Sequence, residues 1–130
     1  MNGRARRASC RGFTLLELLV VMAIIGTLLS IAVPRYFHAL AHARETVLRQ
    51  DLTIMREALD KYYADLGQYP DELARLAERR YLRAVPADPF TKQSATWVLV
   101  QSEDPEHEGI VDVHSGATDL ASDGTPVASW

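Results

Sequence analysis

The hydrophobic positions of this chain begin with one continuous apolar run close to its N-terminus. Residues 13–33 contain a single charged side chain, Glu17. As a helix that rises about 1.5 Å per residue, a run of this length extends for about 30 Å, which is the thickness of the hydrocarbon core of a bilayer. The pattern therefore predicts a membrane-spanning helix over residues 13–33.

From residue 35 onward the apolar run gives way to a periodic pattern. Apolar side chains recur every three or four positions as far as residue 66, with charged residues between them, and this spacing is typical of one face of a helix. The stripe consists of Leu48, Leu52, Met55, Leu59, Tyr62 and Leu66. We expect an amphipathic helix over residues 35–66 that continues the membrane helix and packs its stripe against the rest of the chain.

The remaining residues predict a small head of mixed secondary structure. Gly67 is expected as the C-cap of the long helix, and the charges at both ends of residues 72–79 favour a short helix there. Residues 96–100 and 110–113 favour two antiparallel strands, and a third short strand is an open alternative. Turn-forming residues over 115–126 predict a loop. The fold class is therefore α+β, with a long N-terminal transmembrane helix packed on a small head.

The charges are distributed unevenly along the 130 residues, of which 14 are Lys or Arg and 17 are Asp or Glu. Residues 1–12 contain four arginines and no acid, whereas residues 101–130 contain seven acids and neither Lys nor Arg. By the positive-inside rule, the basic N-terminus stays in the cytoplasm, and the chain after the apolar run lies on the opposite side of the membrane. The slightly negative net charge argues against binding to nucleic acid.

The apolar run has two other interpretations, an ordinary signal anchor and a cleaved secretory signal. The run is longer than a typical h-region, and no small-x-small cleavage site follows it. Instead, Pro34, Arg35 and Tyr36 lead directly into more helix. These features argue against a secretory signal that is removed after the run.

Glu17 is the most informative residue of the apolar run. A carboxylate inside a membrane helix costs about 2.5–3.5 kcal/mol, so it usually has a function and a partner. The run offers no positive charge, so the partner must come from another chain or from a new N-terminus made by proteolysis. Cleavage after Gly12 would place an α-amine on Phe13 that could neutralise Glu17 of a neighbouring copy. The alternative is a tolerated acid near the membrane interface.

The sequence Arg-Gly-Phe-Thr-Leu-Leu-Glu-Leu at residues 11–18 closely resembles the prepilin cleavage and methylation motif of type IV pilins and type II secretion pseudopilins. The resemblance implies cleavage between Gly12 and Phe13 by a prepilin peptidase, N-methylation of Phe13, and assembly into a helical filament. Pro34 resembles the helix-kinking proline of the family. A proline inside a helix predicts a local kink or a melted stretch.

The head is most similar to the major pseudopilins of type II secretion, the general secretion pathway protein G family. The similar stretches are residues 67–70, 82–89, 112–115 and 123–130. The chain departs from the family pattern where Phe90 and Thr91, rather than Trp and Gly, follow the Asp-Pro pair, and its C-terminal loop is shorter. These departures indicate a divergent relative that serves a specialised secretion or pilus-like system.

The same resemblance implies a Ca²⁺ ion in the C-terminal loop. Asp119, Ser122 and Asp123 supply side-chain oxygens within five residues, and calcium binds six to eight oxygens on flexible loops. Their spacing is not that of an EF-hand. The alternative is that these residues cap turns without a metal, as Asp and Ser commonly do.

No set of catalytic residues is evident in the sequence. The chain contains neither a nucleophile elbow nor a phosphate-binding loop, and its one cysteine, Cys10, lies in the predicted leader. His38 and His42 have the spacing of two zinc ligands without a third, so contact with lipid headgroups or other subunits is the preferred interpretation. We expect a protein that is not an enzyme.

The pattern and the resemblance together predict a prepilin leader over residues 1–12, a transmembrane and assembly helix over 13–33, and a periplasmic head over 34–130. We expect a single-pass inner-membrane pseudopilin that prepilin peptidase processes. An inner-membrane platform would assemble it, with further copies and other pseudopilins, into a filament for protein export. The competing interpretations are a type IV pilin, a minor pilin or DNA-uptake pseudopilin, and a membrane-anchored enzyme.

Overall fold

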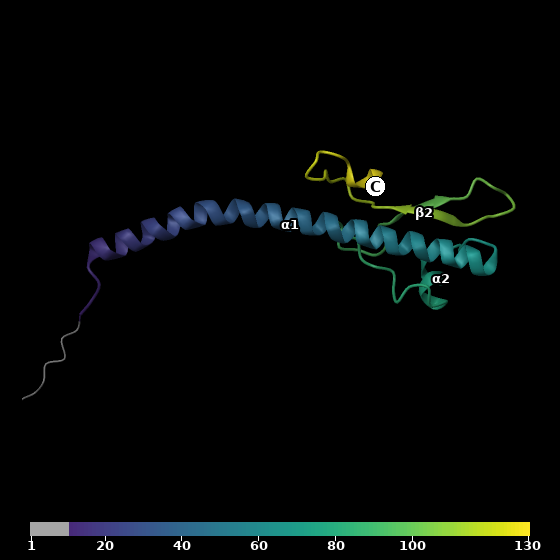
Figure 1. Ribbon diagram of the computed structural model, residues 1–130, viewed down its shortest axis with the longest axis horizontal. Helices are drawn as coiled ribbons and strands as arrows, with labels where there is room; N and C mark the ends of the chain where they lie inside the picture. Colours follow the sequence, from purple (N-terminus) through teal and green to yellow (C-terminus); the bar gives the residue numbers. More distant parts are fainter. Residues whose placement is uncertain (1–10) are drawn as a thin grey trace, which may run out of the picture. The chain divides into compact units, whose positions relative to one another are not determined.

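The computed structural model describes residues 11–130, and Figure 1 follows its elements along the chain. In chain order these are helix α1 (Leu15–Leu66), helix α2 (Leu73–Glu78), strands β1 (Val98–Gln101) and β2 (Ile110–His114), and the 3-10 helix η1 (Val127–Ser129). The predicted leader, with Cys10, lies outside the described residues except for its last two positions. The α+β fold class is confirmed. The chain divides into two compact units, one up to Phe37 and a second from His38 to Trp130, which we call the head.

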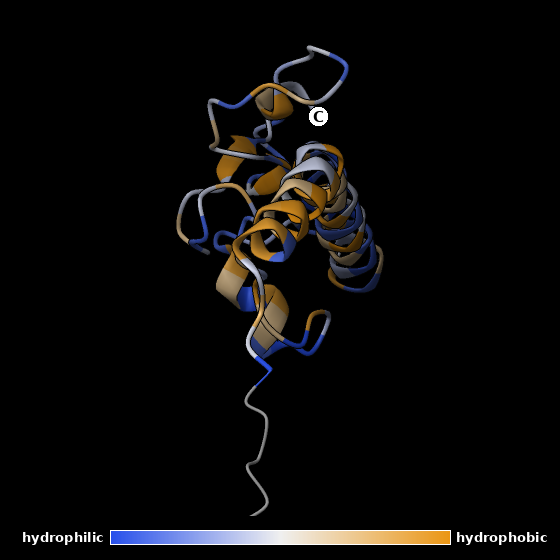
Figure 2. Ribbon diagram, turned by 90° about the vertical axis from the view of Figure 1, so that its left-hand side faces the viewer, coloured by the Kyte–Doolittle hydropathy of each residue, from blue (hydrophilic) through white to orange (hydrophobic). Residues whose placement is uncertain are grey.

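The first unit contains the apolar part of α1. A stretch of this helix has a mean hydropathy of 2.5, and none of it is buried by the described chain. Figure 2 shows these turns largely in orange. The helix is therefore long and apolar enough to cross a membrane. The helix continues through Pro34 without interruption, so the melted stretch predicted at this proline is absent. Proline removes only one N–H from the hydrogen-bond ladder, and the flanking turns keep their hydrogen bonds.

In the head, α1 contributes the apolar stripe that the sequence predicts. All of its members except Leu66 are buried, and Leu66 is 41% exposed because it lies at the last residue of the helix. Ala58 joins the stripe, since it follows Met55 by three positions and is buried on the same face of α1. The stripe packs with residues from α2, β2 and η1; the fully buried ones are Leu76, Ile110, Val113 and Val127.

Helix α2 is shorter than predicted. It covers Leu73–Glu78, with Glu72 at its N-cap and Arg79 at its C-cap, whereas the charges at its ends predicted residues 72–79. Arg80 follows in a left-handed conformation with φ of 64°, which ends the helix. Leu73 and Leu76 are buried as their spacing indicates, so α2 packs on the head through one face.

Strands β1 and β2 form an antiparallel pair in which Val98 lies opposite His114. The register shifts between Val100 and Gln101. The predicted first strand began too early, at residue 96, because Trp97 turns into the core, where its Nε1 donates to the carbonyl of Pro86 at 2.8 Å. The described chain forms no third strand beyond an isolated bridge between Leu120 and Pro126.

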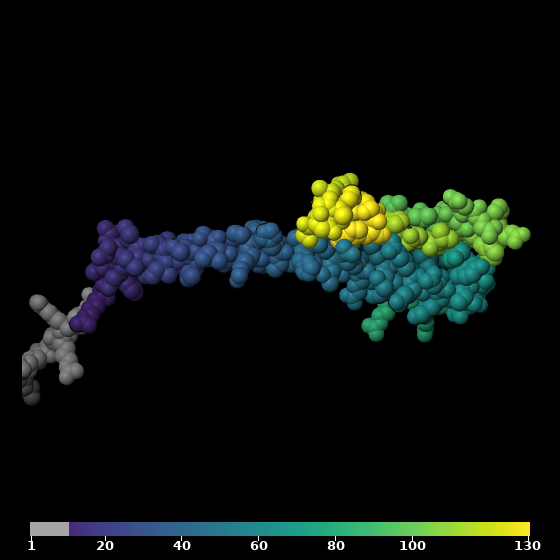
Figure 3. All heavy atoms as spheres, turned by 45° about the horizontal axis from the view of Figure 1, so that its top comes forward, coloured from purple at the N-terminus to yellow at the C-terminus, as the bar shows by residue number. Residues whose placement is uncertain are grey.

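The C-terminal segment returns to α1 and ends in η1, which the sequence analysis did not predict. In Figure 3 these residues, in yellow, lie against the helix. Gly116 permits a close approach, since a Cβ atom at this position would collide with the carbonyl oxygen of Thr96. The segment after β2 can therefore pass directly over the segment before β1.

Candidate functional site

The predicted processing site lies in an exposed segment ahead of α1. Gly12 has no other part of the described chain within 4 Å of the position of a Cβ atom, and the side chain of Phe13 is 90% exposed. Neither residue belongs to a helix or strand. The peptide bond between them is therefore accessible to another protein.

Thr14 and Glu17 form a reciprocal capping box at the start of α1. The backbone N–H of Thr14 donates to Glu17 Oε2 at 2.8 Å, and the backbone N–H of Glu17 donates to Thr14 Oγ1 at 3.2 Å. This arrangement satisfies two N–H groups that the first turn of a helix leaves without partners. The sequence analysis missed it, although the Thr-x-x-Glu spacing is its usual signal.

The capping box gives Glu17 a partner within its own chain. No Lys, Arg or His of the described residues forms an ion pair with this carboxylate. An open apolar groove beside it is lined by Phe13, Leu16, Val20 and Val21. The carboxylate therefore lies at an apolar surface, held by backbone N–H groups rather than by a positive charge.

The residues expected to bind calcium lie in the loop before η1, and side-chain oxygens of two of them, Ser122 and Asp123, bind protein partners. Ser122 Oγ donates to Glu45 Oε2 at 2.9 Å. Asp123 Oδ1 accepts hydrogen bonds from the backbone N–H of Thr125 at 2.9 Å and from its hydroxyl at 2.6 Å. Within residues 11–130, no three His, Cys, Asp or Glu side chains form a group that could hold a metal. Ser122 and Asp123 are therefore engaged within the protein, and calcium binding by Asp119, Ser122 and Asp123 stays an untested prediction.

Glu45 holds the C-terminal loop on α1, a role that the sequence analysis missed. The side chain is buried in the head. Its Oε1 accepts the backbone N–H of Ser122 at 2.6 Å, in addition to the hydroxyl bond to Oε2. One carboxylate therefore fixes the position of a loop 77 residues away in the sequence.

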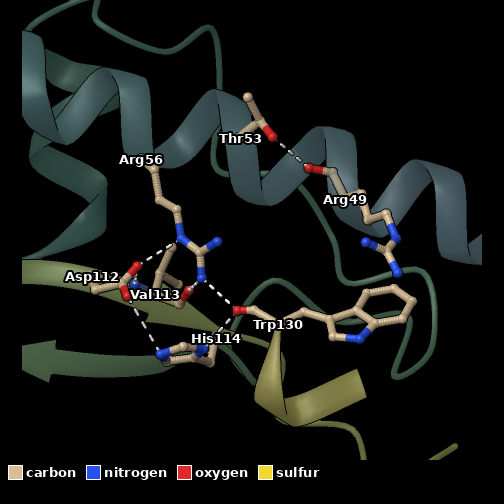
Figure 4. A network of polar contacts seen from close by, with 7 residues as sticks. All are labelled: Arg49, Thr53, Arg56, Asp112, Val113, His114 and Trp130. Carbon is tan, nitrogen blue, oxygen red and sulfur yellow. Dashed lines mark hydrogen bonds and ion pairs between the residues drawn. The ribbon is translucent and has the colours of Figure 1, made fainter. Parts of the chain in front are cut away.

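Arg56 connects α1 to β2 and to the C-terminal segment (Figure 4). Its Nε donates to Asp112 Oδ1 at 2.7 Å, and one terminal nitrogen donates to the carbonyls of Val113 at 3.0 Å and Trp130 at 2.6 Å. Burial raises the pKa of Asp112, but hydrogen bonds from Val113 and Arg56 outweigh it, so this pKa lies below its ordinary value. The network secures the strand and the C-terminal segment to the helix.

Asp88 is the buried acid of the stretch after α2. Its Oδ1 accepts the backbone N–H of Phe90 at 2.8 Å, and its Oδ2 accepts the hydroxyl of Ser115. Ser115 Oγ in turn accepts the N–H of Ala117 at 3.1 Å. Two of the stretches that resemble the pseudopilin head therefore meet at a hydrogen-bonded pair.

The chain is similar in sequence to known proteins along most of its length. The model of the prokaryotic N-terminal methylation motif matches residues 7–33. The type II secretion system core protein G of Klebsiella michiganensis is 31% identical over 130 residues, which cover 88% of this chain and 87% of the relative. That of Klebsiella pneumoniae is 32% identical and covers 89% and 87%.

A pilin is also similar, over a shorter stretch. The type IV major pilin protein PilA of Myxococcus xanthus is 34% identical over 61 residues, which cover 47% of this chain and 28% of the relative. No solved structure matches.

The methylation motif, the exposed apolar helix and the similarity along most of the chain all point to one family. The matched motif includes Gly12, Phe13 and Glu17. The similarity to core protein G extends over the head as well as the helix. The chain belongs to the type II secretion system core protein G family of pseudopilins.

Proposed function

We propose that this chain is a structural subunit of a type II secretion pseudopilus, processed after Gly12 and assembled from the inner membrane into a filament. One observation carries the proposal. The methylation motif over residues 7–33 coincides with an exposed apolar helix that bears a single carboxylate near its start. The proposal gives the chain no catalytic role.

Processing creates the charged group that assembly requires. A prepilin peptidase adds water across the peptide bond between Gly12 and Phe13, which leaves a carboxylate on the leader and an ammonium group on the mature chain. An α-amine of this kind has a pKa of about 7.7–8.0, so it is largely protonated near neutral pH. Methylation of the Phe13 nitrogen keeps it basic.

Glu17 then has two alternative partners. In the membrane-held subunit, the capping box with Thr14 satisfies its carboxylate. In the filament, the ammonium group of Phe13 from a neighbouring copy lies against it. Attraction between opposite charges is strong in an apolar environment. Since every copy presents the same pair, the contact sets the axial register of the subunits.

The orientation of the chain in the membrane follows from its charge distribution. The arginines before residue 13 keep the N-terminus in the cytoplasm, and the head lies in the periplasm. The partners are the prepilin peptidase, an inner-membrane assembly platform, other pseudopilins and further copies of this chain. Pro34 would let the helix bend as it packs into the filament, because its ring removes one backbone hydrogen bond.

Charge reversal at Glu17 tests the proposal. Glu17→Lys should enter the membrane as well as the wild type does but should form no filament, because two positive charges would meet at the contact. Glu57→Lys is the matched control, since Glu57 is an exposed acid on the head part of α1. The measurement is the membrane-bound fraction and the fraction recovered as filaments after the outer membrane is opened. Normal assembly of Glu17→Lys would contradict the proposal.

A type IV pilin is the second candidate. The match with PilA favours it, but that match covers only 47% of this chain. A pilus would extend from the cell surface, whereas a pseudopilus remains in the periplasm. Labelling of the head on intact cells distinguishes the two, since a pseudopilin should be labelled only after the outer membrane is opened.

A further inference from the structure

An open cleft on the head lies between α1 and the C-terminal segment. It is lined by Arg49, Leu52, Thr53, Arg56 and Trp130, and we call it the Arg49–Trp130 cleft (Figure 4). Two of its five side chains are cationic and one is a large aromatic ring. Arginine and tryptophan are among the residue types that most often dominate binding at protein interfaces.

Arg49 is a cation of this cleft whose charge no carboxylate of the described chain pairs with. Its guanidinium lies over the ring of Trp130, 3.8 Å from the centroid, and within residues 11–130 it forms no ion pair. The nearby Asp123 has a pKa below its ordinary value chiefly because Thr125 donates to it, with Arg49 as a smaller cause. Arg56, by contrast, is committed to Asp112 and two carbonyls.

The complementary charge lies at the other end of the head. The loop over residues 102–109 contains four acids and neither Lys nor Arg. Asp104 pairs with His107 at 2.8 Å, whereas Glu103, Glu106 and Glu108 are exposed and form no ion pair within the described chain. The loop therefore presents three unneutralised carboxylates.

The loop cannot reach the cleft of its own chain. The ring of His107 packs against Tyr63, with centroids 5.7 Å apart, which places the loop near the C-terminal end of α1. Tyr63 follows Arg49 by 14 positions, which corresponds to about 21 Å along a helix. Figure 3 shows the loop and the C-terminal segment at separate places on the head.

We propose that the acidic loop over residues 102–109 of one copy docks in the Arg49–Trp130 cleft of another copy. Two different surfaces meet in this contact, so it can repeat from copy to copy along a filament. The inference rests on the proposed function, since it needs copies held on a common axis. Glu103, Glu106 and Glu108 supply carboxylates, and Arg49 supplies a planar cation that binds them.

Cross-linking tests the contact directly. In a Cys10→Ser background, Thr53→Cys places a thiol in the cleft and Pro105→Cys places one at the exposed loop without removing a charge. A bismaleimide applied to filaments should join the doubly substituted chain into a ladder of dimers, trimers and longer products. Each singly substituted chain should give no ladder. Filaments that assemble normally but yield no ladder would overturn the inference, whereas absence of filaments from the wild type would overturn the proposed function.

Exchanging the charges of the cleft and the loop tests whether opposite charges hold the contact together. Arg49→Glu should lower the filament fraction by at least about tenfold, because like charges would then meet. Combining it with Glu103→Lys and Glu106→Lys should restore assembly. Lys61→Glu, an exposed position on the same helix outside the cleft, is the control. Normal assembly of Arg49→Glu, or no recovery in the combined variant despite a folded head, would overturn the inference.

Discussion

Replacing Glu45 by alanine tests how the head holds its C-terminal loop. Glu45 is only 8% exposed, and both of its carboxylate oxygens accept hydrogen bonds from Ser122. The substitution removes both bonds at once and leaves the backbone N–H of Ser122 without its partner. The loop then loses its attachment to this part of α1.

The expected loss follows from these two bonds. A hydrogen bond to a charged group contributes about 1.5–3 kcal/mol, and the low end for each bond gives a loss of about 3 kcal/mol in the free energy of unfolding. For a domain of the size of the head, that loss lowers the Tm by about 12–24 °C. Ser122→Ala removes only the hydroxyl bond and should lower the Tm by about half as much.

Near-UV circular dichroism of the full chain in detergent micelles measures the transition, because Trp97 is buried in the head. Glu57→Ala is the control, since it removes an exposed acid from the same helix. A Tm of Glu45→Ala within about 2 °C of that control would refute the reasoning, because surface substitutions cause changes of that size.

Three further predictions concern the head. Leu59→Ala should cost about 2–5 kcal/mol because Leu59 is fully buried, whereas Leu66→Ala should cost much less in the same thermal scan. The lowered pKa of Asp112 contributes stability that is present above about pH 4 and is lost as the pH falls through that pKa, so Asp112→Asn should lower the Tm near pH 7 and by progressively less as the pH falls below about 4. Millimolar Ca²⁺ should leave the Tm unchanged within about 2 °C relative to a chelator, and a larger rise would show that the loop binds the ion.

Local patterns predicted the helices well. The three- and four-residue spacing from Leu48 to Tyr62 places those side chains on one buried face of α1, because helical periodicity depends only on nearby residues. The boundaries were less accurate. Strand β1 begins at Val98 because Trp97 is drawn into the core, a tertiary effect that strand propensity does not contain.

The contacts of the candidate site also fall into local ones, which the sequence can predict, and long-range ones, which it cannot. The capping box of Thr14 and Glu17 spans three residues, so its signal was present in the sequence and was overlooked. The bonds from Ser122 to Glu45 and from Arg56 to Asp112 span 77 and 56 residues. No local pattern identifies such partners, because only the folded chain brings them together.

Processing at Gly12 is the central claim, and the mass and N-terminal sequence of the protein purified from its native membrane test it most directly. The account predicts a chain that begins at Phe13 and is heavier by one methyl group. A chain that retains residues 1–12 in cells with an active prepilin peptidase would contradict the account.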